Sequence, residues 1–110
     1  MPHRITSLRI SDIIEAIQFI LEYVEGMTFD QFADDRKTID AVVRNFIVIG
    51  EAVSHLPDDF IENHPALPWR EMRDMRNIVV HEYFGVDNLI IWDTVKKNLP
   101  PVLPLLKHLL

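Results

Sequence analysis

Apolar residues recur along the first part of the chain with the three- and four-residue spacing of amphipathic helices. The first such stripe predicts a helix over residues 7–25, which Gly26 would end. Thr28 would then start a single helical turn over residues 28–34. The apolar positions of this first helix are Ile10, Ile13, Ile14, Ile17, Ile20, Leu21 and Val24.

A second, longer stripe predicts a helix over residues 35–56, which Pro57 would end. Gly50 lies inside this stripe. A glycine within a helix costs about 1 kcal/mol relative to alanine, so we expect Gly50 to allow another helix to approach closely. The apolar positions of the stripe are Ile39, Val42, Val43, Phe46, Ile49 and Val53.

The second half of the chain predicts two further helices after a connector over residues 58–65, which has room for one helical turn. The first of them would run from about Pro68 to Tyr83, because proline is favoured at a first helical position, and Gly85 would close it. Asp87 would cap the second, over residues 88–98. We expect Pro100, Pro101 and Pro104 to break or kink the chain before a final apolar turn at 105–110.

No stretch alternates with period two, so strands are not expected. The chain of 110 residues therefore predicts one all-α domain over residues 1–110, an up-and-down bundle of four to five main helices. Cysteine is absent, and no apolar run approaches the ~20 residues of a membrane span. The N-terminus lacks the apolar stretch of a signal peptide, so a cytoplasmic protein is expected.

Arg76 is the residue that departs from the pattern. On a helical wheel of residues 69–83 it falls within the apolar arc, so an anion should meet it: a carboxylate of the protein or a phosphate of a ligand. Tyr83, seven positions on, shares its face, whereas His81 points about 140° away. The helix could end before His81, the arginine could reach around, or a second subunit could supply the histidine. Asn77, four positions before His81, could orient its ring.

Arginine, histidine and tyrosine together suit RNA cleavage without a metal, because the 2′-hydroxyl of RNA is the nucleophile. The alternative is structural: Arg76 would pair with an acid such as Asp40 or Glu51. Asp40, Arg44 and Glu51 share one stripe, which could be a solvated ladder with an Asp40–Arg44 pair or a layer that positions Arg76. The other histidines show no metal-ligand spacing, so no metal site and no cofactor is expected.

The order of these features resembles the HepT-like toxins of the HEPN superfamily. Arg76, His81 and Tyr83 match that family's Arg-x4-His-x-Tyr motif. The context matches as well: the stretch from Asp40 to Ala52 resembles the family's long helix, Pro68-Trp69-Arg70 opens the motif helix, and Ile91-Trp92-Asp93-Thr94-Val95 resembles its last helix. The similarity covers nearly the whole chain.

The resemblance implies a dimeric bundle whose two motifs face each other across a cleft. It implies a metal-independent RNA endonuclease, the toxin of a type VII toxin–antitoxin system, with Arg76 and His81 catalytic. From their positions, we expect Asn77, Asp40 and Glu51 to support these two residues. The implied partner is an MntA-type nucleotidyltransferase antitoxin, which would add AMP to Tyr83 and so block the phosphate site.

Two other functions stay open from the sequence. The bundle could be a non-catalytic partner of a nucleotidyltransferase, with Arg76 gripping a nucleotide, or an inert dimeric scaffold. The net charge of −6 favours these slightly, because a polyanion binds best to a basic surface. An intact Arg76, His81 and Tyr83 favours the ribonuclease.

Overall fold

The computed structural model describes residues 4–83 and 87–110, with the backbone alone for residues 78–83. Within these residues every regular element is a helix, as the sequence predicts. The elements are α1 (Arg4–Tyr23), α2 (Phe29–Ala33), α3 (Arg36–Ser54), α4 (Asp58–Glu62), α5 (Trp69–Tyr83), α6 (Asn88–Asp93), the π-helix η1 (Thr94–Asn98) and α7 (Leu99–Lys107).

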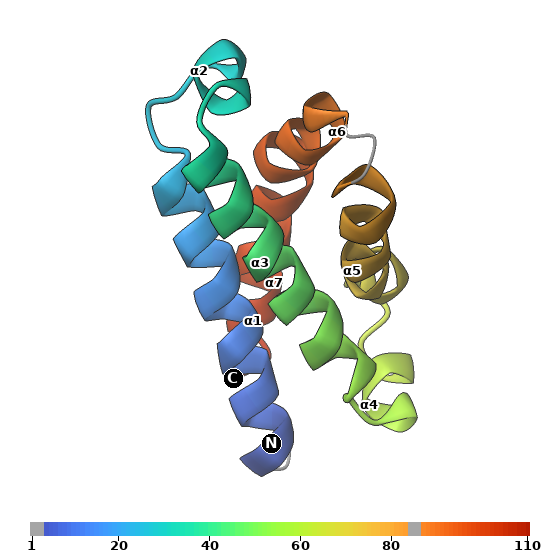
Figure 1. Ribbon diagram of the computed structural model, residues 1–110. Coiled ribbons are helices and arrows are strands. Elements are labelled where there is room, and N and C mark those ends of the chain that lie inside the picture. The colour runs from blue at the N-terminus through green and yellow to red at the C-terminus, as the bar shows by residue number, and fades with distance from the viewer. Residues whose placement is uncertain (1–3, 84–86) are drawn as a thin grey trace.

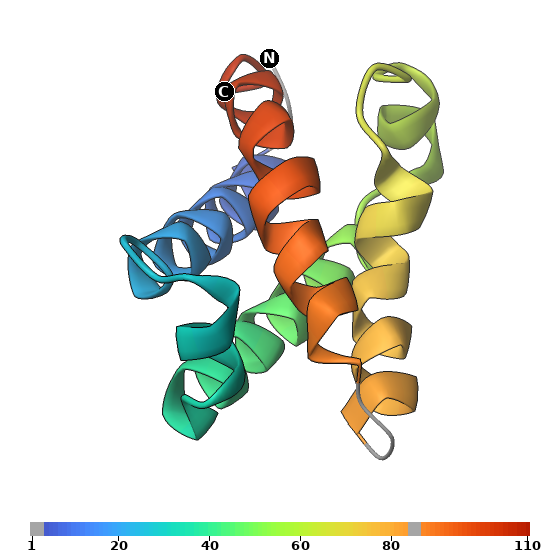
Figure 2. The same ribbon diagram turned by 90° about the horizontal axis from the view of Figure 1, so that it is seen from above.

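The long helices pack side by side around one core. α3 lies between α1 and α5 and contacts both, and α7 packs against α1 (Figure 1). Seen from above, the continuous run of α6, η1 and α7 passes between α1 and α5 (Figure 2). The result is an all-α helical bundle, as the sequence predicts.

The predicted apolar stripes form this core. The six stripe positions of α3 are all buried, and so are those of α1 except Leu21, which is partly buried. Phe32 of α2 adds a fully buried ring that contacts Trp92 of α6 at 5.1 Å between ring centroids. Burial of this kind is the main source of stability, at about 25 cal/mol per Å² of apolar surface.

The predicted caps are confirmed at three helix ends. The Thr28 side chain accepts a hydrogen bond from the Gln31 N–H at 3.2 Å, and the Asp87 side chain accepts one from the Leu89 N–H at 3.0 Å. Gly26 has φ of +74°, a left-handed conformation that suits glycine beyond a helix end. At α3 the Asp35 carboxylate accepts bonds from the hydroxyl and N–H of Thr38, and these bonds lower the pKa of Asp35.

The predicted break at the C-terminal prolines is wrong. Helical structure runs from Asn88 to Lys107 without interruption, and Pro104 lies inside α7. The Leu99 N–H donates to the Thr94 carbonyl, one residue further back than in an α-helix. This wider turn directly precedes Pro100 and Pro101, whose rings and missing N–H groups do not fit the regular i→i−4 bonds of an α-helix.

Candidate active site

The helix that carries the motif, α5, is fixed at its beginning by backbone and side-chain bonds. The Met72 N–H donates to the Pro68 carbonyl at 3.0 Å, as expected for a helix that starts beside Pro68. The Trp69 indole N–H donates to the His64 carbonyl at 2.8 Å, and the Trp69 side chain is buried. The first turn of α5 is therefore anchored to the connector that precedes it.

Gly50 brings the backbones of α3 and α5 together at the motif. A Cβ atom placed on Gly50 would lie 2.9 Å from the Arg73 carbonyl oxygen, 3.0 Å from the Arg76 Cβ and 3.1 Å from the Arg76 nitrogen. The prediction that Gly50 admits a neighbouring helix is confirmed. The helix admitted is α5, at the turn that carries Arg76.

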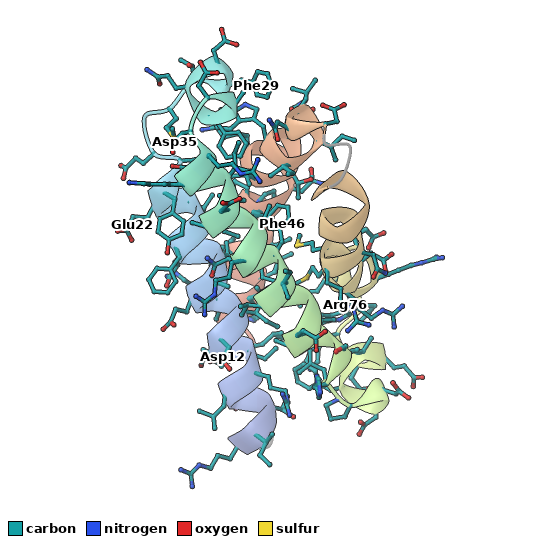
Figure 3. The ribbon with its side chains drawn as sticks, viewed as in Figure 1. Asp12, Glu22, Phe29, Asp35, Phe46 and Arg76 are labelled. Carbon is teal, nitrogen blue, oxygen red and sulfur yellow. The ribbon has the colours of Figure 1, made fainter. Side chains whose placement is uncertain are left out.

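Arg76 meets a carboxylate, and the carboxylate belongs to Glu51. The Arg76 Nη1 and Glu51 Oε1 atoms are 2.7 Å apart, and Figure 3 shows Arg76 at the seam between α3 and α5. The two side chains are 38% and 51% exposed. An ion pair this accessible to water contributes about 0–1 kcal/mol of stability. The guanidinium can therefore exchange this partner for another anion at little cost.

The helical wheel predicted that Arg76 would be more buried than it is. Trp69, Met72 and Met75 are the buried residues of this part of α5, whereas Arg76 lies at the edge of the arc with partial exposure. A long side chain can pack its methylene groups along the apolar surface and hold its charge in water. Arg76 is therefore not a buried charge but a cation presented at a helix seam.

Asp40 is not part of this seam. Its carboxylate pairs with Arg36 Nε at 3.2 Å, so the predicted Asp40–Arg44 pair is wrong. Arg36 lies one turn before Asp40 and Arg44 one turn after it, so either could have taken the carboxylate. Asp40 is eleven positions from Glu51 on α3, a separation of roughly 16 Å at about 1.5 Å per residue. Of the two expected acids, the structure brings only Glu51 to Arg76.

The backbone of α5 answers one question about His81. α5 is helical through Tyr83, so the helix does not end before His81. The register therefore holds: His81 lies about 140° around the helix from Arg76, and Tyr83 lies two turns from Arg76 on its face. Asn77 is exposed, four positions before His81. The side chains of His81 and Tyr83 lie outside the described residues.

Sequence reasoning missed a groove between α1 and α3. Its cavity volume is about 350 Å³, and it is lined by Arg44 and Asn45 from α3 and by acidic and aromatic residues from α1. Phe19 and Tyr23 stack there, with ring centroids 6.2 Å apart. A second groove, of about 330 Å³, shares Asp12 and Val48 with the first and includes Glu51 in its lining. The i,i+4 spacing of Phe19 and Tyr23 is the sequence feature that could have indicated the first groove.

The model of the HepT-like ribonuclease family matches residues 13–109 of the chain. The chain belongs to this family. Curated relatives named as ribonucleases are similar over most of the length of this chain. A Thermococcus cleftensis protein named "Probable ribonuclease HepT" is 46% identical over 91 residues, which cover 83% of each chain. A Methanocaldococcus jannaschii protein named "Putative RNase MJ0127" is 43% identical over 100 residues, 91% of this chain and 83% of that protein.

No solved structure matches this HepT-like chain with statistical significance. The resemblance drawn from the motif and its flanking segments is confirmed by the family match. Among the residues with described side chains, no group of three or more His, Asp or Glu is placed to hold a metal ion. None of the described helices is long and apolar enough to cross a membrane.

Proposed function

We propose that this chain is a metal-independent RNA endonuclease, the toxin of a type VII toxin–antitoxin system, which acts as a single domain over residues 1–110 in the cytoplasm. Membership of the HepT-like ribonuclease family supports the reaction class. The proposal rests on one observation about Arg76. Its side chain is partly exposed where α3 and α5 meet, and it is paired with the carboxylate of Glu51, which a phosphate can replace.

The proposed reaction is an internal transfer. The 2′-oxygen of one nucleotide attacks the adjacent phosphorus, the bond from phosphorus to the 5′-oxygen of the next nucleotide breaks, and a 2′,3′-cyclic phosphate and a 5′-hydroxyl result. His81 moves the proton between these oxygens, since imidazole titrates near neutral pH. Arg76 holds the non-bridging oxygens and stabilises their growing charge. Glu51 and Asn77 support Arg76 and His81. Asp40 was expected to do so too, but its pair with Arg36 argues against it.

The geometry of α5 favours a site made by two protomers. His81 and Arg76 diverge by about 140° on one regular helix, and Arg76 is turned toward Glu51 of its own chain. A homodimer would let Arg76 of one protomer work with His81 of its partner. A two-fold axis would produce the same pairing twice.

Control of the toxin would act on Tyr83. Seven residues of helix place Tyr83 about 10 Å from Arg76 along the same face. AMP added there by an MntA-type nucleotidyltransferase antitoxin would bring a phosphate that competes for the guanidinium.

A non-catalytic role as the nucleotide-gripping partner of such a nucleotidyltransferase is the second candidate. The net charge of −6 favours it, because a polyanionic RNA binds best to a basic surface.

One assay separates the two functions. The purified protein, free of antitoxin, is incubated with RNA in EDTA beside Arg76→Ala and His81→Ala. Cleavage by the wild type that both variants lose supports the ribonuclease. Intact RNA in all three samples, or equal cleavage in all three, refutes it. For the switch, intact-mass measurement after incubation with the antitoxin and ATP should show a gain that Tyr83→Phe abolishes.

A further inference from the structure

The basic residues of α5 gather on one part of the helix surface. At about 100° per residue, Arg70, Arg73 and Asn77 fall within one narrow arc, next to Arg76. Asp74 borders this arc at the Arg70 end, whereas Glu71 falls on the other side. The packing agrees: Glu71 lines the groove between α5 and α7, whereas the carbonyl of Arg73 contacts Gly50 on α3. Arg73 therefore lies at the end of this basic edge that is away from Asp74.

Arg73 is the cation of this edge without an opposing charge. Its neighbours one turn away on α5 are Trp69, Arg70, Arg76 and Asn77, none of them acidic. Arg70 has an acidic neighbour, Asp74, at i+4, and Arg76 forms an ion pair with Glu51. Arg73 is exposed, and among the residues with described side chains it has no ion-pair partner. On a chain of net charge −6, an exposed cation without an ion-pair partner can attract a phosphate.

The register connects Arg73 to the catalytic histidine rather than to Arg76. Arg73, Asn77 and His81 are spaced at i, i+4 and i+8, and α5 is helical across all three. They therefore form one stripe along the helix, which we call the His81 stripe, and Arg76 lies beside it. Along the axis, Arg73 and His81 are about 12 Å apart. That separation lets the two residues engage different phosphates of the same strand.

The contact with α3 also fixes the turn of α5 that carries Arg73. A Cβ atom placed on Gly50 would lie 2.9 Å from the Arg73 carbonyl oxygen and 3.1 Å from the Arg76 nitrogen, so this turn of α5 packs closely on the α3 backbone. A cation that projects from a rigid, packed turn is better oriented for a ligand than one on a loop.

We propose that Arg73 is a substrate-binding residue that holds an RNA phosphate next to the scissile one, so that the strand follows the His81 stripe. This inference rests on the proposed ribonuclease function. Arg73 does not touch the reacting atoms. Its loss should therefore weaken RNA binding and raise KM while kcat at saturating RNA stays unchanged.

The test is the salt dependence of binding to a short fluorescein-labelled single-stranded RNA, measured by anisotropy in the His81→Ala background so that the RNA stays intact. Each phosphate contact on a single strand contributes about 0.7 to the slope of log K against log salt. We expect Arg73→Gln to reduce the slope by about 0.7, equivalent to roughly a threefold change in relative affinity between about 50 and 200 mM salt. Arg73→Lys keeps the charge and should restore the slope.

Lys107→Gln is the matched control, because it removes the same charge from the last turn of α7. Equal slopes in Arg73→Gln and Lys107→Gln, or no RNA binding by the parent variant at any salt, would overturn the assignment of Arg73. The parallel EDTA cleavage assay tests the function itself. If His81→Ala cuts RNA as the wild type does, the ribonuclease fails, whatever the slopes show. If cleavage depends on His81 and Arg76 while the slopes are equal, only the Arg73 proposal fails.

Discussion

Replacement of Gly50 by alanine tests the close crossing of α3 and α5. Two effects oppose each other. Alanine is the better helix former by about 1 kcal/mol. Its Cβ, however, would lie 2.9 Å from the Arg73 carbonyl oxygen, whereas ordinary contact begins near 3.4 Å, and the obstructing atoms at Arg73 and Arg76 are backbone or Cβ atoms. The helices would have to separate by about 0.5 Å, a misfit whose cost in a packed core is typically about 1–3 kcal/mol.

The expected result of Gly50→Ala is a net loss of about 1 kcal/mol in the free energy of unfolding. Urea unfolding followed by circular dichroism at fixed protein concentration measures it, and the melting temperature should fall by about 4 °C. We also expect a lower kcat, because the shift moves the backbone of Arg76 away from Glu51. A gain of about 1 kcal/mol, the value of helix propensity alone, would refute the close approach.

Gly26→Ala supplies the comparison. No described atom lies within 4 Å of a Cβ at Gly26, but its φ of +74° costs a non-glycine residue about 1 kcal/mol. The two variants should lose similar stability for different reasons. Only Gly50→Ala should alter cleavage, and equal kinetic defects in both would mean that general instability, not the seam, is responsible.

Three further predictions concern single contacts. Glu51→Gln should change the free energy of unfolding by less than about 1 kcal/mol, because the pair with Arg76 is exposed. Both KM for RNA and kcat should fall. An unchanged KM would contradict the competition of Glu51 with phosphate. Trp69→Phe should cost about 1 kcal/mol through the lost bond to the His64 carbonyl, measured by urea unfolding, and a neutral result would mean that water replaces the indole. The lowered pKa of Asp35 means that its contribution to stability is present above its unfolded pKa and is lost as the pH falls through the folded value. The difference in urea midpoint between wild type and Asp35→Asn should therefore shrink at acid pH, and a constant difference would rule out this linkage.

Helices and caps were predictable because their signals are local. The stripe from Ile39 to Val53 repeats with the helical period, and Thr28, Asp35 and Asp87 are residues whose side chains accept bonds from a first turn. Gly50 could also be interpreted in advance, since a glycine inside an apolar stripe has few other uses.

The partner of Arg76 could not be predicted, because the choice between Asp40 and Glu51 depends on where α5 crosses α3. The continuation of the helix through the prolines could not be predicted from the neighbouring residues either. Pro100 and Pro101 alone suggest a break, and only the packing of Leu99, Val102 and Leu106 in the core requires the chain to stay helical. The motif identified Arg76, His81 and Tyr83 as site residues. Whether Arg73 or Arg76 shares the stripe of His81 depended on α5 remaining helical through Tyr83.

The π-turn of η1 carries one residue more than an α-helix needs, and this gives the last helix room for a change in length. Its core positions are Ile91, Val95, Leu99, Val102 and Leu106, with successive gaps of four, four, three and four. Deletion of either exposed lysine, Lys96 or Lys97, would change the gaps to four, three, three and four, which is an ordinary α-helical stripe. The same deletion in α1 or α3 would rotate half of the helix out of the core. Insertions and deletions of one residue should therefore be tolerated at this turn more readily than at other positions in the long helices.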